Sequence, residues 1–278
     1  MDIFLRSNEI PTDETAKVGI VIDPPIETIL DEVQKRLNNN NVIKNISFDQ
    51  SEILHNIMEL YNDGEAFEAD MTASELKFYG ARPGYKYAIP EPKFLCDVSP
   101  TRDDIIKIEP EGPLPFKDNS IGSLVIDLPF VISPPNAPSA KSNKPGANMI
   151  MNRFSSYYPL DDLYASYYHW IKEAYRVVKP NGIVVFKCQN TVTGGINASS
   201  EEWSFMCAMK QGFYIIDRFT LQAKARLISS SKIKKQQHAR KYTSSFYVFK
   251  KTIKKRSKEF NYFDLLEKCE SQECQKQQ

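Results

Sequence analysis

At Glu173-Ala174-Tyr175-Arg176-Val177-Val178-Lys179-Pro180-Asn181-Gly182-Ile183 the chain passes from a helix into a strand. Apolar residues recur at helical spacing up to this point, which predicts an amphipathic helix over residues 161–178. Lysine, proline, asparagine and glycine then stop the helix, and the apolar run at 183–186 predicts a buried strand. We therefore expect a helix that turns back at once into a strand of a central sheet.

A second strand leads into Leu124-Val125-Ile126-Asp127-Leu128-Pro129-Phe130. Three apolar residues predict a buried strand, and the polar residue, the proline and the aromatic ring after them end it where a sheet opens into a cleft. The carboxylate of Asp127 and the carbonyl of Leu128 could accept hydrogen bonds from an exocyclic amine, while the ring of Phe130 could stack on a base. A strand followed by an ordinary proline turn is the alternative interpretation.

Both stretches resemble the class I S-adenosylmethionine-dependent amino-methyltransferases. Residues 173–183 resemble their helix, Lys-Pro-x-Gly turn and fifth strand, and Leu114-Pro115-Phe116-Lys117-Asp118-Asn119-Ser120 resembles their approach to the motif strand. Asp127-Leu128-Pro129-Phe130 resembles their motif IV, usually Asp/Asn/Ser-Pro-Pro-Tyr/Phe, with a leucine that also occurs in the ribosomal-RNA adenine dimethylases. The resemblance implies an α/β fold, with a Rossmann-like class I methyltransferase sheet flanked by helices. It also implies a catalytic group made of Asp127, Leu128, Pro129 and Phe130.

The same resemblance implies S-adenosylmethionine as the cofactor. Where the family has its first strand and glycine-rich loop, residues 66–74 hold a short strand-like piece and small, hydroxylic residues, without a Gly-x-Gly. Asp70-Met71-Thr72-Ala73-Ser74, followed by Phe78-Tyr79, resembles the equivalent turn in a group of phage- and bacteria-encoded DNA methyltransferase-like proteins. This narrower resemblance implies that Asp70 and Thr72 contact the cofactor; the alternative is that they only cap and turn the backbone.

Two further acids follow short strands. Residues 93–97 predict a strand that ends at Asp97, and an acid at that position of a nucleotide-binding α/β fold accepts hydrogen bonds from ribose hydroxyls. A third strand is expected over residues 104–108. Glu109 follows it, where the family often places an acid close to the adenine. Asp97 and Glu109 are therefore predicted to bind the cofactor.

The charges are distributed unevenly along the chain, although the net charge is only +1. Residues 1–70 carry 15 Asp and Glu against 5 Lys and Arg, whereas residues 218–258 carry 14 Lys and Arg and no Asp or Glu. A basic run is often only a solvated face, but this one is interleaved with aromatic residues, which favours a nucleic-acid surface. The expected partner is DNA with the target base flipped out, because a base inside a duplex is out of reach.

Several segments could contact that DNA. Residues 133–148, rich in Pro, Ser, Asn and Lys, form either a surface loop or a lid beside the motif strand. Lys187 ends the fifth strand, at the sheet edge of Asp127 if the sheet is parallel, where it could line the cleft or belong to a plain turn. Residues 236–241 are similar to a run in the phage-type group. The candidate nucleic-acid contacts are Arg153, Phe154, Lys187, His238, Arg240 and Lys241.

The chain of 278 residues is long enough for one sizeable α/β domain with appendages. We expect an N-terminal appendage at 1–50, a methyltransferase domain at 51–252 and a polar C-terminal tail at 253–278. Within the domain, the remaining elements are predicted to be helices over 51–61 and 203–209 and strands over 213–219 and 245–249.

Composition argues against several other classes of protein. Five scattered cysteines without a Cys-x-x-Cys, and only three histidines, argue against a disulfide framework and against a metal site. No stretch is apolar for long enough to cross a bilayer, and the first residues lack the pattern of a signal peptide. We therefore expect no membrane partner, no metal and a cytoplasmic location.

The resulting hypothesis is a site-specific DNA methyltransferase that acts on the exocyclic amine of a base. Adenine N6 is favoured over cytosine N4 because, in the family that the chain resembles, members with Asp at the first motif position mostly act on adenine. Two alternatives stay open. Leu128 favours an RNA adenine methyltransferase, and the missing Gly-x-Gly favours a catalytically inactive nucleic-acid-binding protein on a methyltransferase scaffold.

Overall fold

The computed structural model describes residues 42–132, 157, 159–193, 195–224, 238–252 and 262–263. By its contacts the chain divides into two units, Met1–Ile43 and Lys44–Gln278. Only Val42 and Ile43 of the first unit are described, so the helices and strands below all belong to the second unit. The expected loop or lid at 133–148 lies outside the described residues.

Three helices occur where the sequence predicts them: α2 (Gln50–Tyr61), α4 (Leu160–Val177) and α5 (Ser200–Gln211). The cap of α2 is Asp49, whose side chain accepts a hydrogen bond from the N–H of Ser51 over 2.8 Å. Helix α5 ends at Gly212, which adopts the left-handed conformation that glycine tolerates best at a helix end. Local sequence signals therefore set the beginning of α2 and the end of α5.

The strands are short at the beginning of the unit and long at its end. They are β1 (Ile46–Ser47), β2 (Ala69–Asp70), β3 (Phe94–Asp97), β4 (Ile106–Lys107), β5 (Ile121–Asp127), β6 (Val178–Cys188), β7 (Thr191–Thr193), β8 (Ile196–Ala198), β9 (Phe213–Gln222) and β10 (Thr243–Lys251). The strands expected from the sequence are all present. β1, β7 and β8 were not predicted.

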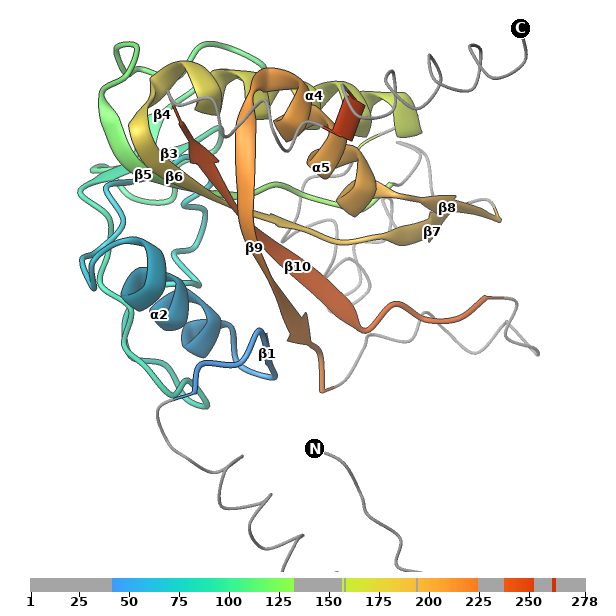
Figure 1. Ribbon diagram of the computed structural model, residues 1–278, viewed down its shortest axis with the longest axis horizontal. Coiled ribbons are helices and arrows are strands. Elements are labelled where there is room, and N and C mark those ends of the chain that lie inside the picture. Colours follow the sequence, from blue (N-terminus) through green and yellow to red (C-terminus); the bar gives the residue numbers. More distant parts are fainter. Residues whose placement is uncertain are drawn as a thin grey trace, which may run out of the picture. The chain divides into compact units, whose positions relative to one another are not determined.

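Among the described residues, an eight-stranded sheet has the order β1-β9-β10-β6-β5-β2-β3-β4, and β7 pairs separately with β8 (Figure 1). In this described sheet β10 runs antiparallel to β6 and β9, and the other neighbouring pairs are parallel. From β2 the chain order runs outward to β4 on one side and to β6 on the other, which is the reversal of a doubly wound α/β sheet. The predicted α/β fold class, with a Rossmann-like, mostly parallel sheet flanked by helices, is confirmed.

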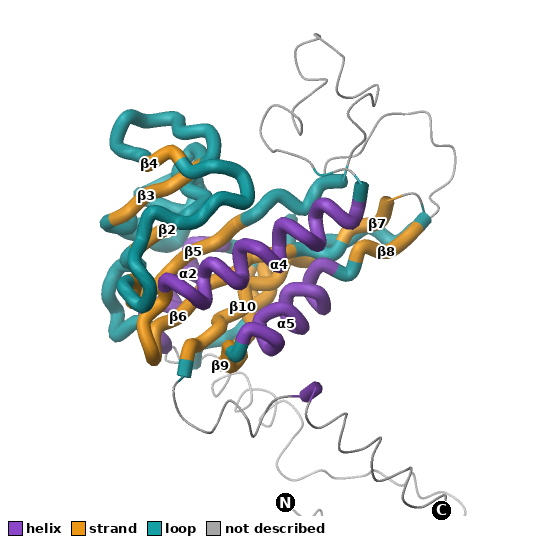
Figure 2. Tube along the Cα trace, turned by 90° about the horizontal axis from the view of Figure 1, so that it is seen from above, coloured by secondary structure: helices purple, strands orange, loops and turns teal. Residues whose placement is uncertain are grey.

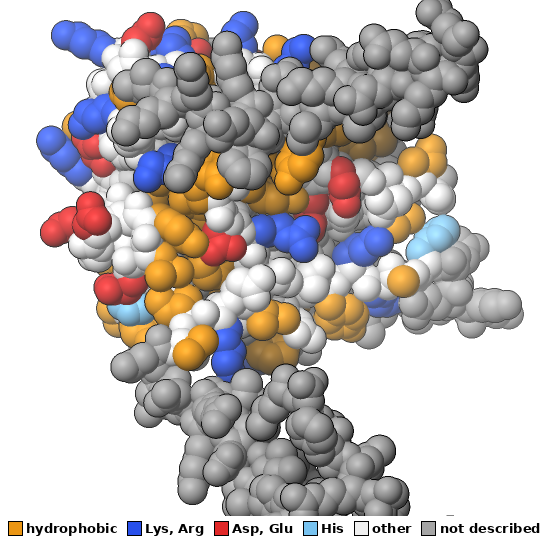
Figure 3. Space-filling view, in the orientation of Figure 1, with side chains coloured by type: hydrophobic (Ala, Val, Ile, Leu, Met, Phe, Trp, Pro, Cys, Tyr) orange, Lys and Arg blue, Asp and Glu red, His pale blue; other side chains and the backbone are white. Residues whose placement is uncertain are grey.

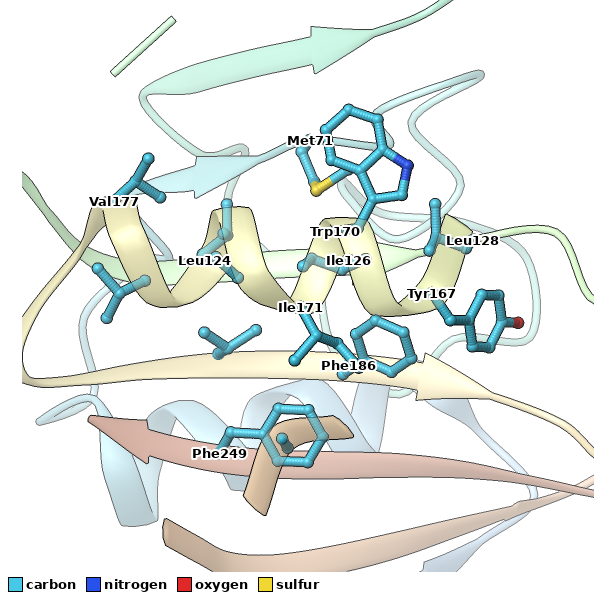
Figure 4. Packing of buried hydrophobic residues seen from close by; sticks show 14 of the residues in the cluster. Met71, Leu124, Ile126, Leu128, Tyr167, Trp170, Ile171, Val177, Phe186 and Phe249 are labelled. Carbon is cyan, nitrogen blue, oxygen red and sulfur yellow. The ribbon is translucent and has the colours of Figure 1, made fainter. Parts of the chain in front are cut away.

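The two faces of the sheet are covered by different helices. Alternate residues of a strand point to opposite faces. Leu124 and Ile126 of β5 pack in a core cluster with buried residues of α4 and α5, whereas Val125 packs in a second cluster with α2. Helices α4 and α5 therefore lie on one face and α2 on the other (Figure 2). Figure 4 shows the first cluster, in which Trp170 and Ile171 of α4 lie over the strands.

The turn at 179–182 is a bulge at the start of β6. Val178 pairs with Ile121 of β5, but the next pair is Ser123 with Ile183, so several residues of β6 loop out opposite one residue of β5. A Cβ atom added at Gly182 would lie 2.6 Å from the carbonyl oxygen of Gly122. Glycine is required there because the two backbones approach too closely for a side chain.

Arg176, at the end of α4, holds the segment that leads into β5. Its guanidinium donates to the carbonyl oxygens of Leu114 and Phe116 over 3.0 and 2.9 Å, and to the carboxylate of Glu173 over 2.7 Å. Glu173 in turn accepts a hydrogen bond from the N–H of Leu114 over 2.9 Å. The helix end and the approach to the motif strand, both recognised in the sequence, are thus joined by one hydrogen-bonded cluster.

Candidate active site

Asp127 and Lys187 lie side by side at the carboxyl edge of the sheet. They occupy paired positions at the ends of the parallel strands β5 and β6. The Lys187 Nζ donates to Oδ2 of Asp127 over 2.9 Å, and the side chains of Lys187 and Asp127 are 14% and 27% exposed respectively. The sequence placed both residues at one edge, and the structure brings them into a hydrogen-bonded ion pair.

Two aromatic rings surround the ammonium of Lys187. Its Nζ lies 4.9 Å from the ring centre of Phe78 and 5.6 Å from that of Phe246. Both distances are within the range of a cation–π interaction. The side chain of Lys187 is therefore fixed by one carboxylate and two rings. In the sequence, Phe78 is noted only as part of the stretch after the predicted cofactor turn, and Phe246 is not connected with the site.

The rest of the motif is held against α4. Leu128 is buried, and the carbonyl oxygen of Pro129 accepts a hydrogen bond from the hydroxyl of Tyr167 over 3.1 Å. Phe130 is half-buried, and the carbonyl oxygen of the next residue, Val131, accepts a hydrogen bond from the N–H of Tyr157 over 2.9 Å. The backbone after Asp127 is thus fixed on two sides. Tyr167, a buried residue of the predicted helix over 161–178, thus supports the motif directly.

Thr72 connects the predicted cofactor turn to the motif. Its hydroxyl oxygen accepts a hydrogen bond from the backbone N–H of Asp127 over 2.7 Å. The same hydroxyl donates to Oδ1 of Asp70 over 3.0 Å, and the backbone N–H of Thr72 donates to that oxygen over 2.7 Å. The turn after β2 and the end of β5 therefore share one continuous set of hydrogen bonds.

The carboxylate of Asp70 lies in the interior. The residue is 2% exposed, and its second oxygen accepts a hydrogen bond from the hydroxyl of Tyr79 over 2.6 Å. Burial raises the pKa of Asp70 to about 6, although the hydrogen bonds from Tyr79 and Thr72 act in the opposite direction. Burial also raises the pKa of Tyr79 well above its ordinary value. Asp70 thus caps the turn, as one of the two sequence interpretations had it; a direct cofactor contact by Asp70 or Thr72 stays a prediction.

Asp97 lies at the end of β3, beside the turn that follows β2. Its two carboxylate oxygens accept hydrogen bonds from the N–H groups of Ser74 and Ser99, over 2.8 and 2.7 Å. A carboxylate has about four acceptor positions, so each oxygen keeps capacity for another donor. Glu109, which follows β4, has a side chain that is 76% exposed and lies 4.0 Å from the ammonium of Lys107.

The turn between β2 and β3 adopts a glycine-like backbone without glycine. Ser74 and Leu76 have φ angles of 46° and 55°, in the left-handed region that glycine usually occupies. The small residue Ala73 donates its N–H to the carbonyl of Cys96 over 3.0 Å, which holds the turn against β3. The residues present thus fit a nucleoside-type cofactor, because a tight turn and a carboxylate with free acceptor positions lie at the carboxyl edge.

The predicted nucleic-acid contacts are only partly described. Arg153 and Phe154 lie outside the described residues. His238 and Arg240 are exposed and Lys241 is half-exposed, and they directly precede β10. Because β10 is antiparallel to β6 and pairs Phe246 with Lys187, the segment before it approaches the edge that carries the ion pair. On the face seen in Figure 3, basic side chains lie among acidic and hydrophobic ones.

The polar residues beyond Lys187 serve the structure around the site. Gln189 is buried and accepts a hydrogen bond from the hydroxyl of Ser244 over 3.0 Å. Asn190 accepts from the N–H of Glu201 over 2.9 Å and donates to Glu202 over 3.0 Å. These two amides fix β10 and the start of α5 to the end of β6.

Three other properties bear on the site. In the described ranges no cluster of His, Cys, Asp and Glu could hold a metal ion, and no described helix is long and apolar enough to cross a membrane.

Cavities of about 410 and 480 Å³ lie away from the carboxyl edge, the first beside the bulge at Gly182 and the second between α5 and β9. The site is therefore defined by its hydrogen bonds rather than by the size of a cavity.

No protein-family model and no curated protein matches the chain. A structure of the complex between the Haloferax volcanii Trm112 methyltransferase activator and a protein described as a methyltransferase has 13% identity, covers 68% of this chain and 84% of its own, and has a TM-score of 0.38. An S-adenosylmethionine-dependent methyltransferase from Thermotoga maritima is 15% identical; the match covers 81% of this chain and 98% of that one, with a TM-score of 0.36. A protein from Thermoplasma acidophilum, also described as a methyltransferase, has 10% identity, coverages of 75% and 66%, and a TM-score of 0.30. Likenesses this weak carry no argument about chemistry, which rests on the geometry above.

Proposed function

We propose that this protein is an S-adenosylmethionine-dependent methyltransferase that acts on the exocyclic amine of a base in DNA, with adenine N6 as the target. The observation that carries the proposal is the position of Asp127-Leu128-Pro129-Phe130. The motif ends β5 at the carboxyl edge, beside the reversal in strand order where α/β sheets bind their ligands, and Thr72 ties it to the turn after β2.

The cofactor side of the proposed site lies at the ends of β2 and β3. Asp97 would accept hydrogen bonds from the ribose hydroxyls with the acceptor positions that Ser74 and Ser99 leave free. Glu109 is exposed at the end of the next strand, where it could accept a hydrogen bond from the amine of the adenine moiety. When bound, S-adenosylmethionine supplies an electrophilic methyl group.

The target side is formed by the motif itself. Oδ1 of Asp127 lies outside the hydrogen bond with Lys187 and would accept one N–H of the target amine, while the carbonyl of Leu128 would accept the other. Two acceptors fix the direction of the nitrogen lone pair, so that catalysis comes mainly from positioning. Because Asp127 is partly exposed, a proton released by the amine can pass through its carboxylate to water.

Phe130 completes the proposed target site. Its half-buried ring follows the two acceptors along the chain and would stack on a flipped base. His238, Arg240 and Lys241 precede β10 at the same sheet edge, where cationic side chains would meet the phosphate backbone. An RNA adenine substrate would use the same groups. Methylation rates on matched DNA and RNA oligonucleotides would separate a DNA methyltransferase from an RNA methyltransferase.

A second candidate function is favoured by a specific observation. Asp127 is already engaged by Lys187, and the turn after β2 lacks Gly-x-Gly, as expected for a scaffold that binds nucleic acid without catalysis. This candidate predicts nucleic-acid binding that survives Asp127→Ala and needs no cofactor.

Calorimetric titration with S-adenosylmethionine tests the cofactor half. We expect the wild-type protein to bind and Asp97→Ala to bind at least about tenfold more weakly, because the substitution removes hydrogen bonds to a charged acceptor. Asp103→Ala, at an exposed position, is the matched control and should bind like the wild type. No binding by a folded wild-type protein would reject the enzyme and leave the scaffold.

Mass spectrometry of nucleosides tests the reaction. DNA from cells that express the wild-type protein should contain N6-methyladenine, and DNA from cells that express Asp127→Ala should not. N4-methylcytosine in place of N6-methyladenine would change the target base but keep the enzyme class. DNA without either modification, from cells that contain folded protein, would reject the proposal for DNA.

A further inference from the structure

We propose that Lys187 and Asp127 act together as a reader of the target base, in which Lys187 recognises the ring nitrogen next to the amine that Asp127 holds. The inference rests on the proposed function and deepens it. It turns a lysine that the sequence suggested for general nucleic-acid contact into a determinant of which base can be methylated.

The pair presents an acceptor and a donor next to each other. Asp127 and Lys187 are directly opposite on neighbouring parallel strands, and their charged groups meet at 2.9 Å. A carboxylate only accepts hydrogen bonds, whereas an ammonium has three donors and no acceptor. The bond to Asp127 uses one of those donors, so the ammonium can donate to a second acceptor beside the carboxylate.

This arrangement is complementary to one chemical pattern. Adenine carries its exocyclic amine beside N1, and cytosine carries its amine beside N3; in both bases the ring nitrogen is an acceptor. An amine directed at Asp127 would therefore place that ring nitrogen on the side of Lys187. Guanine carries its amine between a protonated N1 and the acceptor N3. The orientation that directs N1–H at Lys187 would bring two donors together, which is a repulsive contact, so guanine would fit the pair only with N3 directed at Lys187.

The lysine is positioned for recognition rather than for loose attraction to phosphate. Its side chain is 14% exposed, and in the described part of the chain its ammonium is bounded by the rings of Phe78 and Phe246. An ammonium held in this way cannot swing far along a DNA backbone. It stays at the level of the Asp127 carboxylate, where the edge of a flipped base would enter.

An ion pair contributes little net free energy to the stability of a sheet edge. Removing two charges from water costs free energy that their attraction often only balances, and well-packed apolar residues serve stability equally well. Phe78 and Phe246 show that the surroundings of Lys187 are apolar enough for such packing. The placement of a charged donor there is therefore better explained by a ligand with an acceptor group than by stability.

The test compares two oligonucleotides at the mapped target site. One contains adenine, and the other contains 1-deazaadenine, which keeps the amine but lacks the ring acceptor; 3-deazacytosine replaces it if the mapped base is cytosine. The wild type should methylate the deaza oligonucleotide about 10- to 100-fold more slowly, the range for a hydrogen bond with one charged partner. Fluorescence anisotropy should show weaker binding of the same oligonucleotide.

Lys187→Met provides the second half of a double-mutant cycle. It should lose activity on the natural oligonucleotide, and its ratio of natural to deaza rates should be well below that of the wild type. Dividing the wild-type ratio by the variant ratio removes any intrinsic difference between the two amines. Lys187→Gln, which keeps a neutral donor, should retain part of the discrimination. Lys210→Met, at an exposed position on α5, is the matched control and should behave like the wild type.

The outcomes separate this inference from the proposed function. A wild type that methylates both oligonucleotides equally well would reject the role of Lys187 and leave the proposed function standing. Discrimination that persists undiminished in Lys187→Gln and Lys187→Met would reject it as well. If the wild type methylates no oligonucleotide, the proposed function falls first and this inference falls with it.

Discussion

The hydroxyl of Thr72 accepts a hydrogen bond from the backbone N–H of Asp127 over 2.7 Å and donates one to the carboxylate of Asp70 over 3.0 Å. The first residue of the motif is therefore not placed by its own strand alone. A small rearrangement of the turn after β2, which is the proposed cofactor side, would move the acceptor that the N–H of Asp127 needs.

Thr72→Val is expected to lower kcat about tenfold with a smaller effect on S-adenosylmethionine affinity. Valine has the shape of threonine but leaves the N–H of Asp127 without its acceptor, a loss of roughly 1–3 kcal/mol. Steady-state kinetics and calorimetry measure the two effects separately. Thr72→Ser keeps the hydroxyl and should restore most of the rate; a serine variant as slow as valine would contradict the role of the hydrogen bond.

Asp70→Asn is expected to make the protein more stable at pH 8 and not at pH 4. Burial raises the folded-state pKa of Asp70 to about 6, against about 3.9 in an unfolded chain. The folded protein therefore binds the proton more tightly, and the stability linked to it is present below pH 4 and lost as the pH rises through 6. A shift of this size corresponds to about 3 kcal/mol.

Urea denaturation of the wild type and Asp70→Asn at pH 4, 6 and 8 checks the sign. The difference between the two midpoints should be near zero at pH 4 and should grow towards pH 8. Asp103→Asn, at an exposed position, should stay within about 0.5 kcal/mol of the wild type throughout. A wild-type advantage at pH 8 would show that the ionised form of Asp70 is the favoured one.

Phe130→Ala is expected to weaken oligonucleotide binding by about 5- to 100-fold, because stacking of one base on an aromatic ring contributes roughly 1–3 kcal/mol. The affinity for S-adenosylmethionine should not change, since the ring belongs to the target side of the proposed site. Anisotropy titrations with and without cofactor measure both. Phe130→Tyr, which keeps a stacking ring, should bind nearly as well as the wild type; equal losses in both variants would argue against stacking.

Arg176→Met is expected to destabilise the fold by about 2–4 kcal/mol, since it leaves two backbone carbonyls without their donor and removes the charged partner of the Glu173 carboxylate. Arg102→Met provides the comparison. Arg102 donates to the carboxylates of Glu91 and Asp104, but on an exposed surface, where such ion pairs contribute little to stability. Thermal denaturation should therefore give a clearly lower melting temperature for Arg176→Met than for Arg102→Met. Similar losses in both variants would contradict a stabilising role of the hydrogen-bonded cluster at Arg176.

Much of the fold could be predicted because its signals are local. Helix α4 matches the expected range to within one residue at each end, since its buried residues recur at helical spacing. The strands β5 and β6 were predicted from their apolar runs, whereas their pairing with each other comes from the structure. β1 and the β7–β8 pair were not predicted, because their two or three residues do not lie in a recognisable apolar run, as those of the equally short β2 and β4 do.

The site could be predicted only in outline. The positions of Asp127, Asp97 and Lys187 at strand ends follow from the apolar runs before them. The contacts that arrange these residues do not. Thr72 and Asp127 are 55 residues apart, and the stretch that contains Tyr79 was noted in the sequence without any sign of its hydrogen bond to Asp70. Such contacts depend on the three-dimensional placement of turns, for which a single sequence carries little signal.

The position of β10 in the sheet determines how late in synthesis the sheet can be completed. This strand, formed by Thr243–Lys251, lies between β6 and β9 in the sheet, although it is the last of the three to be synthesised. Until it emerges, β6 has an open edge and β9 has no partner on the side of the core. The sheet can therefore close only when synthesis has passed residue 251, and a ribosome that stalls earlier would release a chain with an exposed strand edge, prone to aggregation.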